Sequence, residues 1–310
     1  MVVWSGGRRR RGGKKSEGEG KKMIKVKIRS GGNEVDIEIR RAGLSVMREL
    51  ERWGILGLSQ LDGLIFHKGL EARRRLDLFF GCKFEGEYRG AGYKVLGRLE
   101  KRGLAAVHRF ANVPRVYTLT RKGHDVLLKA GLAKLEDYRD SVADSLVKHE
   151  LLVNGIGLTI SELLGLRVST EFERQVLSRG AKKKYERGSF PLPDLWVSGD
   201  DQPKAIEVER TQKSAMRYRK LWSFYRGCLP KCAVVLYVTS FPNGPRLLLF
   251  QARKVSADFI YVCSLEDFQA SLGGCPFIGY RGGEIYLKRR PEPIGINFAA
   301  ESREGYAHAL

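Results

Sequence analysis

The feature that most constrains the fold is one long helical pattern, from Ser141 to Leu164, followed by short patterns that alternate as strands. A helix of this length with an apolar stripe has to be covered along that stripe by other elements. The patterns after it are, in order, strand-like at 166–176, 190–197 and 205–209, helical from Thr211 to about Arg226, and strand-like at 232–239, 246–251 and 259–262. This order predicts an αβββαβ domain of the α+β or α/β class over residues 141–290.

Three acidic residues lie where two of these strands would be neighbours. Asp194 stands in the second strand pattern, and Glu207 and Glu209 stand in the third. Alternate residues of a strand share a face, so Glu207 and Glu209 lie together while Ile206 and Val208 enter the core. Converging carboxylates repel one another, and a hard divalent cation such as Mg²⁺ or Mn²⁺ removes that cost. Such an ion activates water for attack on a phosphodiester. The alternative is that these acids lie on a solvated strand face.

Other residues of this region have candidate roles beside the three acids. Glu171, on the first strand pattern, is a reserve metal ligand. His149 lies on the apolar stripe of the long helix, so we expect a hydrogen-bonded core histidine. On the helix after Glu209, a basic stripe recurs at helical spacing and consists of Lys213, Arg217 and Lys220. This stripe either contacts DNA backbone or is a solvated face.

An earlier segment, residues 43–132, has a different order of patterns: helix, helix, basic helix, two strands around a turn at 112–114, and a last helix. This order, with the string VLGRLEKRGL followed by YTLTRKGHDVL, resembles winged helix-turn-helix DNA-binding domains. The resemblance implies that the basic third helix enters the major groove and that the two-stranded wing contacts the backbone. The predicted DNA-binding residues are Lys94, Arg98, Lys101, Arg102, Arg109 and Arg115. A winged helix used for protein contacts is the alternative.

The charge of the chain favours a polyanionic partner. Lys and Arg number 56 against 35 Asp and Glu, a formal net charge of +21. Residues 1–29 hold eleven basic and two acidic side chains among many glycines. We therefore expect residues 1–42 to be a basic, disordered arm that adds phosphate contacts, or else a solubilising tail. Residues 291–310 are expected to form a second tail.

Several classes of protein are excluded by composition. The longest apolar run, Cys232 to Val238, is too short to span a membrane, and no apolar segment follows the basic N-terminus as in a secretory signal. Five cysteines show no disulfide framework, and five scattered histidines show no metal-binding spacing. The expected setting is the cytoplasm, in association with the nucleoid or a plasmid.

The carboxylate pattern resembles the PD-(D/E)xK nuclease superfamily. Pro193-Asp194 supplies the "PD" and Glu207 the "(D/E)", whereas Glu209 stands where this family has lysine. Lysine migrates within the superfamily, and Lys213 is the best substitute. The resemblance implies a restriction-endonuclease-like domain in which Asp194, Glu207, Glu209 and Lys213 form the catalytic set.

Over residues 43–265, the winged pattern followed by HELLVN, PDLWV and IEVERTQKSAMRYRKLWSFY resembles the replication-relaxation family, which is close to the MobC-like mobilisation relaxases. The resemblance implies a metal-dependent enzyme that nicks one DNA strand at a transfer or replication origin of a mobile element. By this resemblance, Asp194, Glu207 and Glu209 bind the metal, and His149 and Asn154 mark the long helix of the family. Either water or a tyrosine such as Tyr218 would attack the phosphodiester.

A second hypothesis is a protein of another class. Glu209 in the lysine position favours a non-catalytic, sequence-specific DNA-binding protein, such as a replication initiator, a relaxosome accessory factor or a transcriptional regulator. In both hypotheses the partner is double-stranded DNA, with single-stranded character at an origin, and no membrane is involved. Further partners would be a second copy of the chain or relaxosome proteins.

Overall fold

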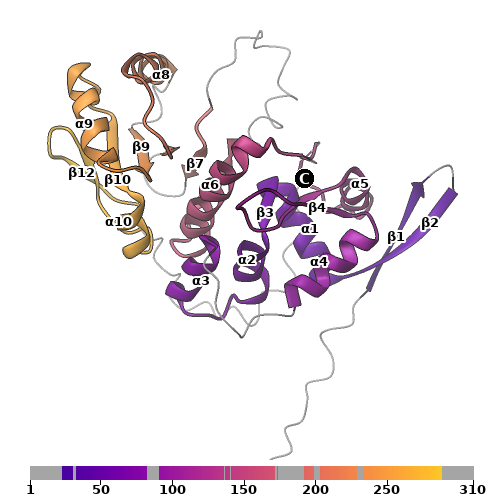
Figure 1. The fold of residues 1–310 in the computed structure, drawn as a ribbon. Coiled ribbons are helices and arrows are strands. Elements are labelled where there is room, and N and C mark those ends of the chain that lie inside the picture. The colour runs from indigo at the N-terminus through magenta and orange to yellow at the C-terminus, as the bar shows by residue number, and fades with distance from the viewer. Residues whose placement is uncertain are drawn as a thin grey trace, which may run out of the picture.

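The computed structural model describes residues 23–30, 33–81, 91–135, 137–139, 141–171, 173, 192–198, 203–228 and 234–287. They form a mixed α/β protein with three sheets (Figure 1). Residues 1–22 of the expected arm and the expected tail at 291–310 lie outside the described residues.

A small antiparallel sheet organises the first half of the chain. Its strands are β3 (Ile55–Gly57), β5 (Val116–Leu119) and β4 (Ala105–His108), in that order. Helices surround it, namely α1 (Arg41–Trp53), α2 (Leu58–Leu61), the π-helical turn η1 (Asp62–Phe66), α3 (Ala72–Phe79), α4 (Ala91–Lys101) and α5 (Arg121–Lys129). The Thr120 hydroxyl accepts a hydrogen bond from the Gly123 amide and thereby caps α5 where the sheet ends.

A larger mixed sheet organises the second half. The chain enters it through α6 (Asp144–Glu162), and its remaining helices are α8 (Ala215–Cys228), α9 (Gly244–Lys254) and α10 (Leu265–Ala270). The strands are β6 (Arg167–Thr170), β7 (Leu195–Ser198), β8 (Lys204–Glu209), β9 (Val234–Thr239), β10 (Ile260–Ser264), β11 (Phe277–Gly279) and β12 (Glu284–Ile285), which lie side by side in this order. The pairs β6–β7 and β7–β8 are antiparallel, whereas β8–β9 and β9–β10 are parallel.

Both faces of this sheet are covered. Ile206 and Val208 of β8 belong to the apolar core that includes α6 residues, whereas Ala205 packs with Trp222 and Tyr225 of α8. The predicted alternation of β8 is therefore confirmed, and its odd-numbered residues face α8. Because helices lie on both sides, all six residues of β8 are buried.

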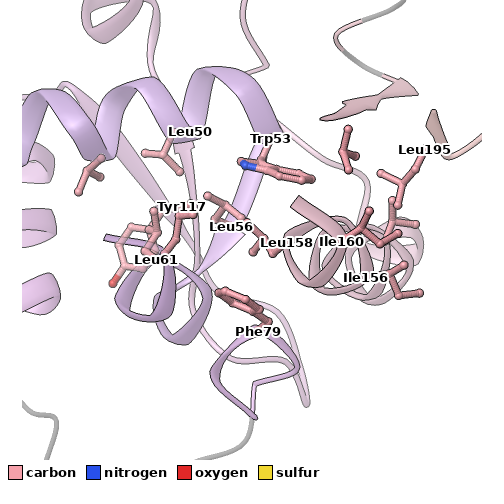
Figure 2. Packing of buried hydrophobic residues seen from close by; sticks show 14 of the residues in the cluster. Leu50, Trp53, Leu56, Leu61, Phe79, Tyr117, Ile156, Leu158, Ile160 and Leu195 are labelled. Atoms are coloured by element: carbon pink, nitrogen blue, oxygen red, sulfur yellow. The ribbon is translucent and has the colours of Figure 1, made fainter. Parts of the chain in front are cut away.

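Helix α6 joins the two halves into one core. Trp53, the last residue of α1, is buried, and a Cβ atom built on Gly157 of α6 would lie 2.6 Å from its indole. Figure 2 shows the Trp53 ring directed toward α6, with Leu56 next to it and Leu195 of the larger sheet beyond. Glycine at position 157 is required because the ring occupies the space of a side chain.

Buried polar contacts fix the same junction. The Gln60 amide nitrogen donates to the carbonyl of Phe79 at 2.9 Å and to that of Leu151 at 2.8 Å. The Asn154 amide of α6 donates to the carbonyl of Ile55 in β3. Each bond joins a buried side-chain amide to a backbone carbonyl of another element, so the two halves fit in one relative position.

The start of α4 is held from a different helix. The carboxylate of Asp62, buried in η1, accepts a hydrogen bond from the amide of Gly92. Burial raises the pKa of Asp62 to about 6, and the Gly92 amide opposes that rise. A Cβ atom at Gly92 would lie 2.0 Å from the Asp62 carboxylate, so only glycine allows this contact.

The prediction of a disordered arm over residues 1–42 is wrong for its last part. Residues Met23–Ser30 (β1) and Asn33–Arg40 (β2) form an antiparallel hairpin that contacts α5, and Arg41 already begins α1. In Figure 1 the hairpin extends away from the larger sheet. Its register places Lys25 opposite Glu38 and Lys27 opposite Asp36.

Two strand predictions in the second half also need correction. Residues 246–251 belong to helix α9, which begins with Gly244 and Pro245. Their run of consecutive apolar residues carries no clear period, and Pro245 at the first turn is the helix indicator. The strand expected over 166–176 ends at Thr170, and Glu171 already has helical backbone. Among the described residues, no helix is long and apolar enough to cross a membrane.

The junction gives a direct stability prediction. Gly157→Ala forces a methyl group into the Trp53 ring and should lower the free energy of unfolding by about 1–3 kcal/mol, the usual cost of overpacking a core. Gly97→Ala in α4 is the matched control, because no atom lies within 4 Å of a Cβ there. It should be neutral or stabilising, since alanine favours helix. Urea denaturation of both variants measures this, and equal effects would contradict the role given to the Trp53 contact.

Candidate functional site

The three predicted acids meet where β7 begins and β8 ends. Leu195 of β7 pairs with Ile206 of β8, so Asp194 lies at the level of Glu207. The Asp194 Oδ2 atom accepts a hydrogen bond of 2.7 Å from the Val208 amide, which fixes its carboxylate against β8. Glu207 and Glu209 follow Ala205 on the face toward α8. The structure therefore brings together the residues that the sequence pattern singled out.

Lys213 also reaches this group. Its Nζ atom forms an ion pair with Oε1 of Glu209, although four residues separate them in sequence. Helix α8 begins at Ala215, later than the predicted start at Thr211, and the Ser214 hydroxyl accepts from the Arg217 amide at 3.3 Å. Lys213 thus stands in the link between β8 and α8. Its own amide donates to the Tyr218 hydroxyl at 3.1 Å, which holds this link in place.

Glu207 is buried between β8 and α8. Its Oε1 atom accepts a hydrogen bond from the hydroxyl of Tyr225 in α8. Burial raises the pKa of Glu207 well above its usual value, and the negative charge of Asp194 raises it further. The pKa of Glu209 is also raised by burial, while Lys213 opposes that rise. Keeping Glu207 and Glu209 ionised therefore costs folding free energy.

His149 is the residue whose role the sequence did not reveal. It was expected in the core, yet its side chain is 28% exposed and its Nε2 atom lies 3.1 Å from Oδ1 of Asp194. Burial lowers the pKa of His149, but the hydrogen bond and negative charge of Asp194 outweigh burial, and the net pKa is raised. Asp194 is 45 residues away, and no local pattern links the two; only the fold shows the contact.

Glu171 approaches the cluster through its backbone. Its amide donates to the carbonyl of Asp194 at 3.1 Å, so the residue lies directly beside the start of β7. Because β6 ends at Thr170, the argument that placed Glu171 on a strand face beside the other acids does not apply. Its assignment as a reserve metal ligand stays a prediction.

The three carboxylates suit a divalent cation, although each of them is bonded to a protein side chain in this structure. Asp194, Glu207 and Glu209 offer only carboxylate oxygens, which Mg²⁺ and Mn²⁺ prefer. Each has its own partner, namely His149, Tyr225 and Lys213. Within the described part of the chain, no three His, Cys, Asp or Glu residues are grouped so as to hold a metal ion. The residues fit the ion in chemistry, and the ion pair with Lys213 would have to rearrange to admit it.

The predicted DNA-binding residues lie on two exposed faces. On α4, Lys94, Arg98 and Lys101 are exposed, and so are Arg109 and Arg115 in the connection between β4 and β5. Arg102 is exposed as well, but its guanidinium donates to the backbone carbonyl of Glu38 in β2 and so also holds the hairpin.

The second face belongs to α8. Arg217 and Lys220 are exposed there, in the first turns of the helix, which follows the link that carries Lys213. Tyr218, Trp222 and Tyr225 are buried on the opposite side of this helix.

Comparisons with known proteins add little to this geometry. No family model and no curated protein matches the sequence. Among solved structures, the chain is similar to one described as "protein VC1899 from Vibrio cholerae", with a TM-score of 0.30 and 13% sequence identity. The match covers 75% of this chain and 55% of that one, so the chain spans about half the length of that protein. A similarity this weak carries no argument about fold or function.

The crowding of acids predicts a stabilising substitution. Glu207→Gln keeps an acceptor for the Tyr225 hydroxyl and removes a buried charge, so the variant should unfold with about 1–2 kcal/mol more free energy at pH 8. The raised pKa of Glu207 means that the folded protein binds a proton that the unfolded chain releases above its ordinary pKa. Wild-type stability should therefore fall as pH rises from 4.5, and the difference between the two proteins should widen.

Urea denaturation at pH 5 and pH 8 measures this difference. The exposed Glu266 of α10 provides the control, since Glu266→Gln should change little at either pH. A less stable Glu207→Gln protein at pH 8 would show that the ionised carboxylate supports the fold instead of burdening it.

Proposed function

We propose that the chain is a metal-dependent DNA endonuclease that nicks one strand at a specific site, such as the origin of a mobile element. The observation that carries this proposal is the meeting of Asp194, Glu207 and Glu209 with the Lys213 ammonium group at one end of the β7–β8 pair. The order α6-β6-β7-β8-α8-β9, with two antiparallel pairs and then a parallel one, supports a restriction-endonuclease-like domain.

In this proposal the acids would hold Mg²⁺ or Mn²⁺. Neighbouring groups orient the carboxylates and would stabilise charge on the substrate. A bound divalent ion would supply charge neutralisation and a more acidic water. Asp194 is oriented by the Val208 amide and by His149. Lys213, released from Glu209 when the acids bind the ion, would stabilise negative charge on the phosphodiester, which is the task of the lysine that Glu209 replaces.

Water is the preferred nucleophile over Tyr218. That tyrosine is only 2% exposed, stacks on Trp222 and accepts from the Lys213 amide. Burial raises the pKa of Tyr218 to about 12, so its hydroxyl stays protonated near neutral pH. A buried, protonated phenol is poorly suited to attack a phosphodiester on the surface.

The first half of the chain would select the DNA. Helices α1, α2, α4 and α5 with the β3-β5-β4 sheet follow the order of a winged helix-turn-helix, which supports that assignment. The turn η1 and helix α3, which the expected order lacks, lie between α2 and α4. In this arrangement α4 presents Lys94, Arg98 and Lys101 to the major groove, and the β4–β5 connection presents Arg109 and Arg115.

A second candidate is a DNA-binding protein without nuclease activity. The observation that favours it is that each acid already has a partner, with Glu209 paired to Lys213 and Glu207 bonded to Tyr225. Titration calorimetry with Mn²⁺ separates the two candidates. The endonuclease should bind Mn²⁺ in the wild type and lose that binding in Glu207→Gln, whereas the second candidate should show no carboxylate-dependent binding.

Catalysis is tested on supercoiled plasmid carrying the origin of the element that encodes the chain. With Mg²⁺ the wild type should convert it to the open circle, and EDTA should prevent this. Asp194→Ala and Glu207→Ala should lose at least about 100-fold in rate, and Lys213→Ala should lose about 10-fold or more. Glu266→Ala, remote in sequence and exposed, should nick normally. Equal nicking by Glu207→Ala would overturn the site.

Binding by α4 is tested through salt dependence on duplex DNA. Arg98→Ala/Lys101→Ala removes two exposed charges, so the slope of log K against log salt should fall by up to about 1.8, or 0.9 for each lost phosphate contact. Arg253→Ala/Lys254→Ala in α9 removes the same charge from another exposed face and should leave the slope unchanged. Fluorescence anisotropy in a salt series measures both. Equal slopes for the two variants would exclude α4 as the DNA contact.

A further inference from the structure

Two cysteines come together at the far side of the larger sheet from β6. Cys263 lies on β10, and Cys275 lies two residues before β11, which pairs with β10 in antiparallel fashion. Both cysteines are free, and their thiols are hydrogen-bonded to each other. Their spacing in the sequence does not reveal this contact, because helix α10 and a turn lie between them.

Both cysteines line one cavity of about 740 Å³. Three polar side chains share its wall, namely Ser264, Asp267 and Ser271. The cysteines themselves are almost covered, since Cys263 is 4% exposed and Cys275 is 6% exposed. A small polar molecule that enters this cavity therefore meets two adjacent sulfur atoms, whereas a bulky thiol reagent is kept away from them.

The two thiols differ in acidity. Burial raises the pKa of the Cys263 thiol, and its hydrogen bond to Cys275 raises it further, so this thiol stays protonated. The same hydrogen bond lowers the pKa of Cys275, and a second one from Ser271 lowers it as well, while burial opposes both. Because the thiolate is the nucleophilic form of cysteine, Cys275 is suited to attack and Cys263 to follow.

The turn that carries Cys275 is tightly held against β10. After α10 the Gly273 amide donates to the carbonyl of Phe268 at 2.7 Å, and the Ser271 hydroxyl donates to the carbonyl of Asp267 at 2.7 Å. These bonds keep the segment before β11 close to the helix that follows β10. The two sulfur atoms are thus brought together by backbone that is fixed on both sides.

We propose that Cys263 and Cys275 are a peroxide-reactive pair that forms a reversible disulfide. The ligand class is a small hydroperoxide, because the cavity admits small molecules to thiols that are otherwise covered. The proposal concerns a site separate from the three acids and does not depend on the proposed endonuclease activity.

The reaction takes place in two balanced steps. The Cys275 thiolate attacks one oxygen of hydrogen peroxide, so that an S–O bond forms, the O–O bond breaks, and the departing hydroxide takes up a proton to give water. The Cys263 thiol then attacks the sulfur of the resulting sulfenic acid, so that the S–S bond forms and the S–O bond breaks. The second hydroxide leaves with the Cys263 proton as water. The two thiols lose two electrons, which reduce the peroxide.

The test treats the folded, dilute full-length chain with hydrogen peroxide, blocks the remaining thiols, and maps the digested peptides by mass spectrometry. A peptide pair linked through Cys263 and Cys275 should appear, and dithiothreitol given before blocking should remove it. Oxidation without this linked pair, or linkage of either residue mainly to another cysteine, would overturn the proposal. Neither result bears on nicking of DNA.

Single variants test the role of each thiol. In Cys263→Ser the sulfenic acid of Cys275 has no partner, so further peroxide should give a sulfinic acid that dithiothreitol does not reverse. In Cys275→Ser the remaining thiol is buried and protonated, so peroxide should oxidise Cys263 at least about tenfold more slowly than it oxidises the wild-type pair. Oxidation of Cys263 at the wild-type rate would overturn the assignment of Cys275 as the attacking thiol.

A serine pair tests the hydrogen bond to Cys275. Ser271→Ala removes a donor that favours the thiolate, so disulfide formation should slow by about two- to fivefold. Ser161→Ala is the matched control, because that hydroxyl also donates to a carbonyl of its own helix, α6, and the rate should not change. Equal rates for the two variants would exclude Ser271 from activating Cys275.

Discussion

The packing of α6 between the two sheets determines the rest of the architecture. On one side Gly157 receives the Trp53 ring and Asn154 bonds the Ile55 carbonyl of β3. On the other side α6 contacts β6 and β8, and Ile156 and Ile160 belong to the apolar core shared with these strands. A single helix therefore sets the distance from the small sheet to the larger one. Had position 157 carried a side chain, the two halves would stand further apart and the polar contacts between them would be lost.

The acid cluster works against the stability of this core. Glu207 and Glu209 are buried on β8 beside Asp194, which stands just before β7, and burial raises the pKa of both glutamates. The partners that relieve this cost come from three different places: His149 from α6, Lys213 from the link before α8, and Tyr225 from within α8. Stabilisation from several elements is the arrangement expected where charge is retained for a task other than folding.

Periodicity predicted the parts of the fold whose side chains repeat over enough residues. The long helix at α6 and the alternation of β8, with Ile206 and Val208 inward on one face, are confirmed. The lysines of the β1–β2 hairpin give it the composition of a basic arm, although apolar residues alternate with them and β2 carries acidic residues in register with them. Helix α9 was missed because four apolar residues in succession carry no period.

The contacts of the candidate site also fall into those that the sequence predicted and those that only the fold shows. The spacing of Asp194, Glu207 and Glu209 identified a group that the strand register then brought together. The contact of His149 with Asp194 depends on how α6 crosses the sheet, and the pairing of Lys213 with Glu209 depends on where the link before α8 turns. The first contact is not encoded in a local pattern, because it joins elements whose relative position is set by the whole core. The second joins residues only four apart, and the sequence already placed Lys213 with the acids.

The shared helix has a geometric consequence for the proposed endonuclease. Asn154 and Gly157, which pack against the half proposed to select DNA, and His149, which touches Asp194, all lie within three turns of α6. No hinge separates them within this continuous helix. The protein would then cut at a fixed distance, in base pairs, from the bases that α4 contacts. Sites would be recognised as a motif and a cut at constant spacing, with no tolerance for inserted bases between them.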